Sequence, residues 1–168
     1  MNTSEIITLL RAYNHTVRQI TGIVIHCSAT KEGKDFSAFD IHKWHKERGF
    51  NGIGYHFVIR LDGTIEVGRQ LSQRGAHTTG HNKNTIGVCY IGGLDESGNA
   101  KDTRTPEQKE ALRWLITAIR TNLPHGMTLT VKGHRDYSPD KNGDGVISKY
   151  ERIKECPCFD VIPEYEAV

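Results

Sequence analysis

Residues 22–28 read GIVIHCS, in which a short run of apolar, β-branched side chains leads to a histidine, His26. This segment gives the first indication of both the fold and the functional site. A run of this length and composition is typical of a buried strand. A second run, at residues 129–131, leads into the segment VKGHRD and its histidine, His134. Each run therefore places a histidine, His26 or His134, at the end of a predicted strand.

Cys156, in the segment KECP at residues 154–157, adds a thiolate to the two histidines. Two histidines and one thiolate form a three-ligand zinc site that leaves the fourth position of the tetrahedron open. An open position distinguishes a hydrolytic zinc from a structural one, because water can be activated there for attack on a carbonyl. Ligands so far apart in the chain are a weak signal, so three unrelated residues are the alternative.

The composition predicts one soluble globular domain that spans residues 1–168. Hydrophobic residues make up 36% and charged residues 25% of the chain, and the net charge is only +2. So balanced a charge gives no reason to expect nucleic-acid binding. No stretch approaches the ~20 apolar residues of a membrane span, so we expect no membrane insertion. The first residues have no basic flank and no long apolar run, which predicts synthesis in the cytoplasm without a secretory signal.

The hydrophobic patterns predict three helices. Residues 1–20 are expected to form an amphipathic helix. Its apolar face would consist of Ile6, Leu9, Leu10, Tyr13 and Val17. Ser37 and Asp40 have the spacing of a capping box, which opens a helix that Gly49 ends. Thr105, Pro106 and Gln108 open a longer helix in the same way.

Strands are predicted between these helices. Residues 55–60 and 64–67 should form a hairpin around the turn Asp62-Gly63, and residues 85–91 form a further apolar strand. Residues 70–84 are polar and lack periodicity, as expected of a functional loop. We therefore predict an α/β fold with a central mixed β-sheet flanked by helices. Ligands usually bind at the rim where such strands end, so the two histidines should meet there.

Several segments, in order between residues 22 and 162, closely resemble the T-odd phage lysozymes. They are HCSAT at 26–30, GYHF at 54–57, IGVC at 86–89 and KECP at 154–157, together with WHK at 44–46, DGT at 62–64 and IGG at 91–93. The proteins of that family are zinc-dependent N-acetylmuramoyl-L-alanine amidases, within the wider amidase type 2 and peptidoglycan recognition protein superfamily. The resemblance implies the fold of that family and an amidase activity on peptidoglycan.

The resemblance also implies roles for individual residues. It makes His26, His134 and Cys156 the zinc ligands. It makes Tyr55 and Lys154 the catalytic residues, because a hydroxyl donor and a cation can stabilise the oxyanion that forms when an amide is attacked.

Other positions carry weaker implications. His77, in the segment RGAH, and Asn84 are candidates for substrate binding by resemblance. Cys158 remains an alternative to Cys156 as the thiolate ligand. His56 should point away from the side of the strand that Tyr55 occupies, and so lie in the core or support a ligand. The histidines expected at the surface or on helices are His15, His42, His45 and His125.

Residues 140–151 read DKNGDGVISKYE and depart from the family, because the phage relatives have a much shorter connection here. The segment matches an EF-hand loop at positions 1, 3, 5, 6 and 12. The predicted calcium ligands are the side chains of Asp140, Asn142, Asp144 and Glu151 and the carbonyl of Val146. The alternative is a turn without a metal, since no clear helix precedes the segment.

The predicted function is zinc-dependent hydrolysis of the amide bond between N-acetylmuramic acid and L-alanine in bacterial peptidoglycan. We expect a monomer, similar to a phage or prophage endolysin, that reaches the cell wall with the help of a holin-type partner. One alternative is a non-catalytic module that binds peptidoglycan fragments. Another is a regulatory protein that binds a second protein. The stem-peptide preference and the source organism stay open at this point.

Overall fold

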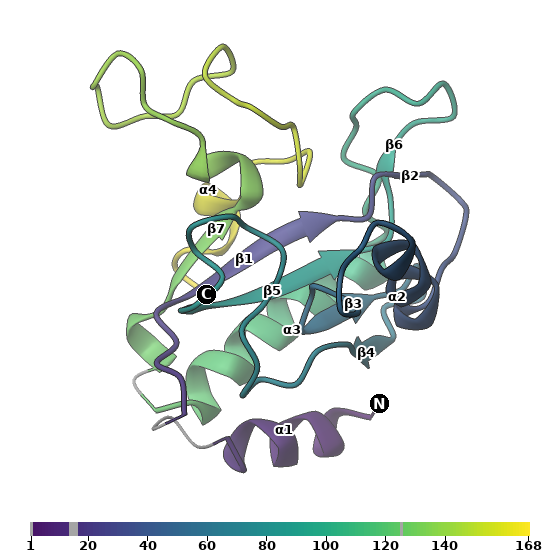
Figure 1. Ribbon diagram of the computed structural model, residues 1–168, viewed down its shortest axis with the longest axis vertical. Coiled ribbons are helices and arrows are strands. Elements are labelled where there is room, and N and C mark those ends of the chain that lie inside the picture. The colour runs from purple at the N-terminus through teal and green to yellow at the C-terminus, as the bar shows by residue number, and fades with distance from the viewer. Residues whose placement is uncertain (1, 14–16, 125) are drawn as a thin grey trace.

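The structure is a computed structural model in which residues 2–13, 17–124 and 126–168 are described (Figure 1). His15 and His125 lie outside these residues. A five-stranded sheet has the strand order β4-β3-β5-β1-β7. Its strands are β1 (Gly22–Cys27), β3 (Phe57–Ile59), β4 (Ile65–Val67), β5 (Thr85–Tyr90) and β7 (Thr130–Gly133). This sheet, flanked by helices, confirms the predicted α/β fold.

Strand direction determines which strand ends lie together. β1 is parallel to both β5 and β7, and β3 is parallel to β5. β3 and β4 form the predicted antiparallel hairpin. A separate parallel pair is formed by β2 (Thr30–Lys31) and β6 (Gly93–Leu94). The carboxyl ends of β1, β5 and β7 therefore share one edge of the main sheet.

Helices cover both faces of the main sheet. One face packs against α1 (Thr3–Arg11), α3 (Pro106–Asn122) and α4 (Val161–Tyr165), and Figure 1 shows α3 along this face with α1 beside it. The other face carries α2 (Ala38–Glu47), whose Ile41 packs with Val58 and Cys89. Two short 3-10 helices, η1 (Gly126–Thr128) and η2 (His134–Tyr137), flank β7.

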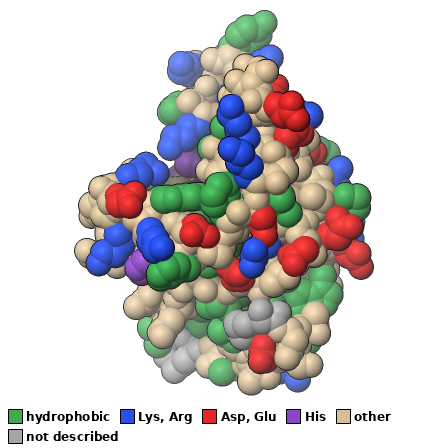
Figure 2. Space-filling model, turned by 90° about the vertical axis from the view of Figure 1, so that its right-hand side faces the viewer, with side chains coloured by type: hydrophobic (Ala, Val, Ile, Leu, Met, Phe, Trp, Pro, Cys, Tyr) green, Lys and Arg blue, Asp and Glu red, His purple; other side chains and the backbone are tan. Residues whose placement is uncertain are grey.

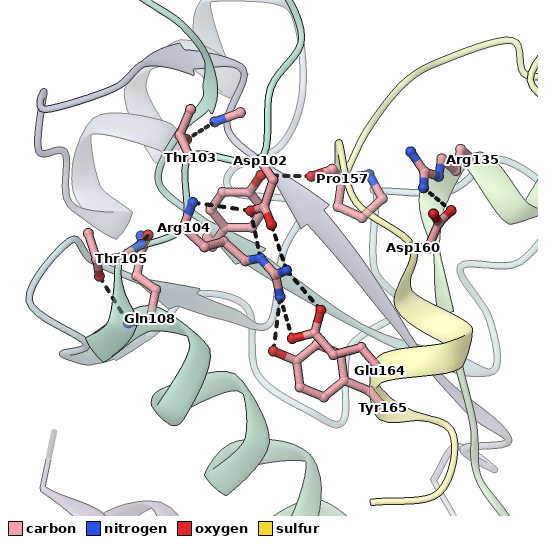
Figure 3. Close-up of polar contacts among 12 residues, drawn as sticks. Asp102, Thr103, Arg104, Thr105, Gln108, Arg135, Pro157, Asp160, Glu164 and Tyr165 are labelled. Carbon is pink, nitrogen blue, oxygen red and sulfur yellow. Dashed lines mark hydrogen bonds and ion pairs between the residues drawn. The ribbon is translucent and has the colours of Figure 1, made fainter.

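The capping residues explain where α2 and α3 begin. The Ser37 side chain accepts a hydrogen bond from the Asp40 N–H while the Asp40 carboxylate accepts one from the Ser37 N–H. Gly49 follows α2 with a φ of +84°, a conformation that favours glycine. Thr105 and Gln108 form the equivalent box at α3 (Figure 3). These predicted helix boundaries are confirmed.

The predicted first helix is too long. α1 ends at Arg11, and the described residues from 17 to 20 are not helical. The reason is the buried Arg18, whose guanidinium donates to the Gln73 carbonyl and, at 3.0 Å, to the Thr85 carbonyl. These bonds hold the chain against the loop that precedes β5, so the chain leaves the helix axis before it enters β1.

The predicted strand at residues 55–60 is also shorter than expected. β3 covers only Phe57–Ile59, although the His56 N–H still donates to the Gly87 carbonyl at 2.8 Å. Residues 70–84 contain no helix or strand in the structure, which describes every one of them, so the predicted loop is confirmed.

A buried ionic cluster fixes the C-terminal segment to the rest of the fold (Figure 3). The Arg104 side chain is only 2% exposed and contacts the carboxylates of Asp102 and Glu164 at 2.8 and 2.9 Å. Its guanidinium carbon lies 3.2 Å from the ring centre of Phe159. The Tyr90 hydroxyl donates to the Pro157 carbonyl at 2.7 Å. The chain around Cys156 is therefore held on the edge of the sheet.

The surface carries charges of both signs. On the face shown in Figure 2, basic and acidic side chains are interspersed. Among the described residues, no helix has the length and apolar character needed to cross a membrane.

Candidate metal centre and catalytic cleft

The structure brings His26, His134 and Cys156 together. One ligand atom from each lies within 4.8 Å of the others. The pairing of β1 with β7 explains the meeting of the histidines, because Ile25 pairs with Gly133 and each histidine is the next residue. The two imidazole rings are 4.6 Å apart between centres. Parallel neighbouring strands thus place both rings at one edge of the sheet.

The position of Cys156 comes from tertiary contacts. Its Sγ lies 3.7 Å from Nδ1 of His26 and accepts a hydrogen bond from the Cys27 N–H at 3.3 Å. The Arg135 N–H donates to the Cys156 carbonyl at 2.8 Å. The Cys158 Sγ instead lies 3.8 Å from the Cys27 Sγ. It is therefore Cys156, and not Cys158, that joins the two histidines.

These three residues fit a divalent metal ion. Burial, with a contribution from His77, lowers the pKa of His26 well below its usual value. Burial also lowers the pKa of His134 to about 4. Both rings are therefore neutral near pH 7, as a metal ligand requires. Zn–S and Zn–N bonds of roughly 2.3 and 2.05 Å at a tetrahedral angle separate S from N by about 3.6 Å, close to the observed 3.7 Å.

A cleft of about 500 Å³ opens beside this cluster, and Tyr55 and Lys154 line it with His134 and Cys156. The ring centre of Tyr55 is 5.1 Å from that of His26. Burial raises the pKa of Tyr55, so its hydroxyl stays protonated and can donate a hydrogen bond at neutral pH. Lys154 is exposed and its charge contributes to the lowered pKa of His134. The cleft thus combines a hydroxyl donor, a cation and a candidate metal centre.

The two predicted substrate residues lie in different places. His77 lines the cleft, and its Nδ1 is 3.0 Å from Nε2 of His26. The Asn84 side chain donates to the Gln19 carbonyl at 2.9 Å and lines a separate hollow. Asn84 is therefore not brought to the cleft, and its hydrogen bond to the segment before β1 gives it a structural explanation.

Sequence reasoning did not place Asn82 and His45 in the cleft, although both line it. The Asn82 side chain lines the cleft and accepts from the N–H groups of His77 and Thr78 at 2.7 and 2.8 Å. His45 was expected at the surface or on a helix; it lies on α2 but is only 7% exposed. Its Nδ1 accepts from the Gly54 N–H at 2.9 Å. Only the presence of Asn82 in the polar loop could have suggested one of these positions.

His56 is a buried core residue. Its Nδ1 accepts from the Gly87 N–H at 3.0 Å, and its Nε2 lies 3.1 Å from the Gln73 carbonyl. The ring therefore links β5 to the loop that forms one wall of the cleft, consistent with the expected position in the core.

The metal-free protein is expected to lose stability as the pH falls below about 6.5, the usual pKa of a histidine side chain. Burial, with a contribution from Arg18, lowers the pKa of His56 to about 3, whereas an unfolded chain protonates near pH 6.5. Between these values the unfolded state binds a proton that the folded state does not. The contribution of His56 to this loss is at most about 1.4 kcal/mol per pH unit.

Denaturant unfolding of the metal-stripped protein near pH 7, 6 and 5 measures this effect. A His56→Gln variant should show a shallower dependence on pH, because the substituted side chain does not titrate. His81→Gln is the control, since His81 is exposed, and it should keep the wild-type slope. Equal slopes for the wild type and His56→Gln would contradict the prediction.

The predicted calcium loop gains no support from the structure. It projects from the body of the molecule (Figure 1), and its carboxylates at Asp140, Asp144 and Glu151 do not form a group with ligand atoms within 4.8 Å. Glu151 instead accepts from the N–H groups of Lys141 and Ser148, both at 2.8 Å. The carboxylate that was expected to bind calcium therefore closes the loop by hydrogen bonds.

Comparison with known proteins defines the class to which this site belongs. Residues 16–157 match the family described as N-acetylmuramoyl-L-alanine amidase. Because the match covers most of the chain, the protein belongs to this family, and the predicted resemblance is confirmed.

Similar proteins include phage endolysins. The endolysin of Enterobacteria phage K11 is 38% identical over 147 residues, which are 87% of this chain and 86% of the relative. The endolysin of Escherichia phage T7 is 36% identical over 139 residues, covering 83% and 81%. Among solved structures, the amidase LysC from Clostridium intestinale URNW has 28% identity and a TM-score of 0.62, with 86% of this chain and 80% of that chain covered. Bumblebee PGRP-SA has 26% identity and a TM-score of 0.62, covering 82% and 75%.

Proposed function

We propose that the protein hydrolyses the amide bond between N-acetylmuramic acid and L-alanine in bacterial peptidoglycan, with zinc held by His26, His134 and Cys156. The observation that carries the proposal is the convergence of these ligand atoms within 4.8 Å beside the cleft. Membership of the amidase family and the likeness to phage endolysins support it. The three-residue donor set leaves a fourth position open, as catalytic zinc sites do.

When bound, zinc supplies a Lewis acid and lowers the pKa of a coordinated water. The residues of the chain would supply the remaining parts of the reaction. Tyr55 keeps its hydroxyl proton, so it can donate a hydrogen bond to the amide oxygen as negative charge develops there. Lys154, at the exposed side of the cleft, brings a positive charge to the same region. Both groups would stabilise the transition state more than the substrate.

Product analysis tests the bond that is cut. Purified peptidoglycan is incubated with the protein, and the soluble products are examined by mass spectrometry. Amidase activity should release free stem peptides that begin with L-alanine and leave glycan chains without peptides. Fragments that keep the sugar–peptide bond would refute the proposal. Binding of fragments without any cleavage would favour the alternative, a non-catalytic binding module.

Tyr55→Phe is expected to reduce kcat by on the order of 10²-fold, the usual effect of removing one donor to an oxyanion. Zinc content should be unchanged, because Tyr55 is not one of the three clustered ligands. Steady-state release of stem peptides measures the effect, with zinc analysis of the same preparation as the control. A variant with wild-type kcat would remove Tyr55 from the reaction.

The route to the substrate is part of the proposal. The endolysin relatives support action on the cell wall, and we propose that a monomer made in the cytoplasm reaches the wall with a holin-type partner. Expression with and without a holin-type pore tests the route. Lysis that requires both proteins agrees with it, and lysis by this protein alone contradicts it.

Calcium binding by residues 140–151 is a separate proposal, supported by the EF-hand spacing of the segment. A site with a dissociation constant of about 10 µM would add about 2.7 kcal/mol of stability at about 1 mM calcium. Calorimetric titration and thermal unfolding measure binding. Asp144→Asn is the matched variant, because its side-chain oxygen can still accept from the Val146 N–H while the charge is lost. No heat and no change in Tm would refute calcium binding.

A further inference from the structure

The face of the sheet that carries His26 has a gap beside it. Side chains alternate along β1, so Ile25 and Cys27 face the core under α3 while His26 faces the side of α2. On the neighbouring strand β5, Cys89 pairs with His26 and Gly87 pairs with Val24. Gly87 has no side chain, so the sheet surface diagonal to His26 is open to a group from outside the sheet.

The imidazole of His77 occupies this gap. A Cβ atom added at Gly87 would lie 2.5 Å from Cδ2 of His77, and one added at Gly75 would also lie 2.5 Å from that atom. Real Cβ atoms do not approach so closely, so both glycines are needed for the ring to fit. The Asn82 side-chain oxygen accepts a hydrogen bond from the backbone N–H of His77 at 2.7 Å. The ring is therefore fixed by the sheet below it and by its own loop.

The fixed ring is aimed at His26. Its Nδ1 lies 3.0 Å from Nε2 of His26, and the two rings are nearly perpendicular at 82°. The Thr78 hydroxyl lies 3.1 Å from the same Nδ1. Nδ1 of His26 is the nitrogen nearest Cys156, at 3.7 Å, so it is the nitrogen that faces the candidate metal centre.

The positions of the protons follow from these contacts. A neutral imidazole carries one N–H, and the nitrogen that binds a metal must offer its lone pair. If Nδ1 of His26 binds the metal, Nε2 carries the proton and donates it. His77 then accepts through Nδ1. Metal-bound histidines almost always donate their second N–H to a fixed acceptor, which sets both tautomer and ring orientation.

We propose that His77 is a positioning residue that accepts the Nε2–H of His26 and so holds Nδ1 of His26 toward the metal. This role replaces the substrate-binding role that the resemblance implied. The inference rests on the metal centre of the proposed function, but not on the bond that is cleaved. Zinc affinity, not only activity, should therefore depend on His77.

Zinc affinity measured by competition with a chelator tests the inference. His77→Ala should weaken zinc binding about 10–100-fold, the usual effect of losing such a partner. His77→Asn should restore part of the loss, because its side-chain oxygen can take the place of Nδ1 as acceptor. His81→Ala is the control in the same loop. The His81 side chain is exposed and packs on Tyr137, not on His26, so this variant should leave zinc affinity unchanged. Wild-type zinc affinity in His77→Ala, with a raised KM, would overturn the inference.

Two further measurements do not depend on removing His77. Gly87→Ala keeps the histidine but displaces its ring, so zinc binding should weaken in the same direction. In the zinc-loaded wild type, long-range ¹H–¹⁵N correlation should show the His26 proton on Nε2. A proton on Nδ1 would overturn the inference even if the variants fail to fold. Protein that binds zinc but leaves peptidoglycan intact would refute the proposed function and would leave these readouts to decide the role of His77.

Discussion

Cys156→Ser is expected to abolish zinc retention and to lower kcat/KM on peptidoglycan by on the order of 10³-fold or more. The thiolate is one of only three protein ligands in the proposed centre, and a hydroxyl does not replace it as a zinc ligand. Loss of the Lewis acid costs several kcal/mol in the transition state, and each 1.36 kcal/mol is about tenfold in rate. Zinc content and release of stem peptides, measured on the same preparation, show both effects.

Cys158→Ser is the matched control for this substitution. Cys158 is two residues away, but its Sγ lies next to that of Cys27. The variant should keep its zinc and its activity. Loss of zinc in Cys158→Ser with retention in Cys156→Ser would reverse the assignment of the thiolate.

Arg104→Met is expected to destabilise the fold by on the order of 3 kcal/mol. The substitution removes a buried guanidinium and leaves the carboxylates of Asp102 and Glu164 facing each other without it (Figure 3). Removing one partner of a buried ion pair lowers the free energy of unfolding by about 3–5 kcal/mol. We expect the lower end because the Asp102 and Glu164 side chains are 33% and 31% exposed. For a chain of this size the change lowers Tm by about 6–12 °C.

Thermal unfolding measures this loss, and Lys101→Met is its control. Lys101 forms an ion pair with Glu32 at 2.9 Å, but the Lys101 side chain is 52% exposed, whereas that of Arg104 is 2% exposed. Exposed pairs contribute little, so the control should unfold close to the wild-type Tm. An Arg104→Met variant as stable as this control would show that the buried cluster does not hold the C-terminal segment.

The parts of the fold that could be predicted depend on local chemistry. The capping boxes at Ser37 and Thr105 set the starts of two helices because the pairing is made within four residues. The position of His26 and His134 at one edge followed from parallel strands, whose carboxyl ends coincide. The end of the first helix could not be predicted, because it depends on the contacts of Arg18 with a loop more than fifty residues away.

The parts of the site that could not be predicted depend on packing between distant segments. The resemblance favoured Cys156 over Cys158, but spacing alone left the choice open, because it depends on contacts with Cys27 on β1. The position of the His77 ring depends on Gly87, where any side chain would occupy the same space. That Gly87 lies beside β1 is known only from the strand pairing in the structure. The resemblance singled out His77 as a substrate-binding candidate, but the sequence alone does not show that its ring fills this gap.

We propose that cleavage of the amide requires a metal ion that would be held by His26, His134 and Cys156. The most direct test strips the purified protein with a chelator, reloads it with one equivalent of zinc, and measures newly exposed L-alanine amino groups on purified peptidoglycan at each stage. We expect release by the untreated protein, no release after stripping, and full recovery after reloading. Equal release by metal-free and zinc-loaded protein would contradict it.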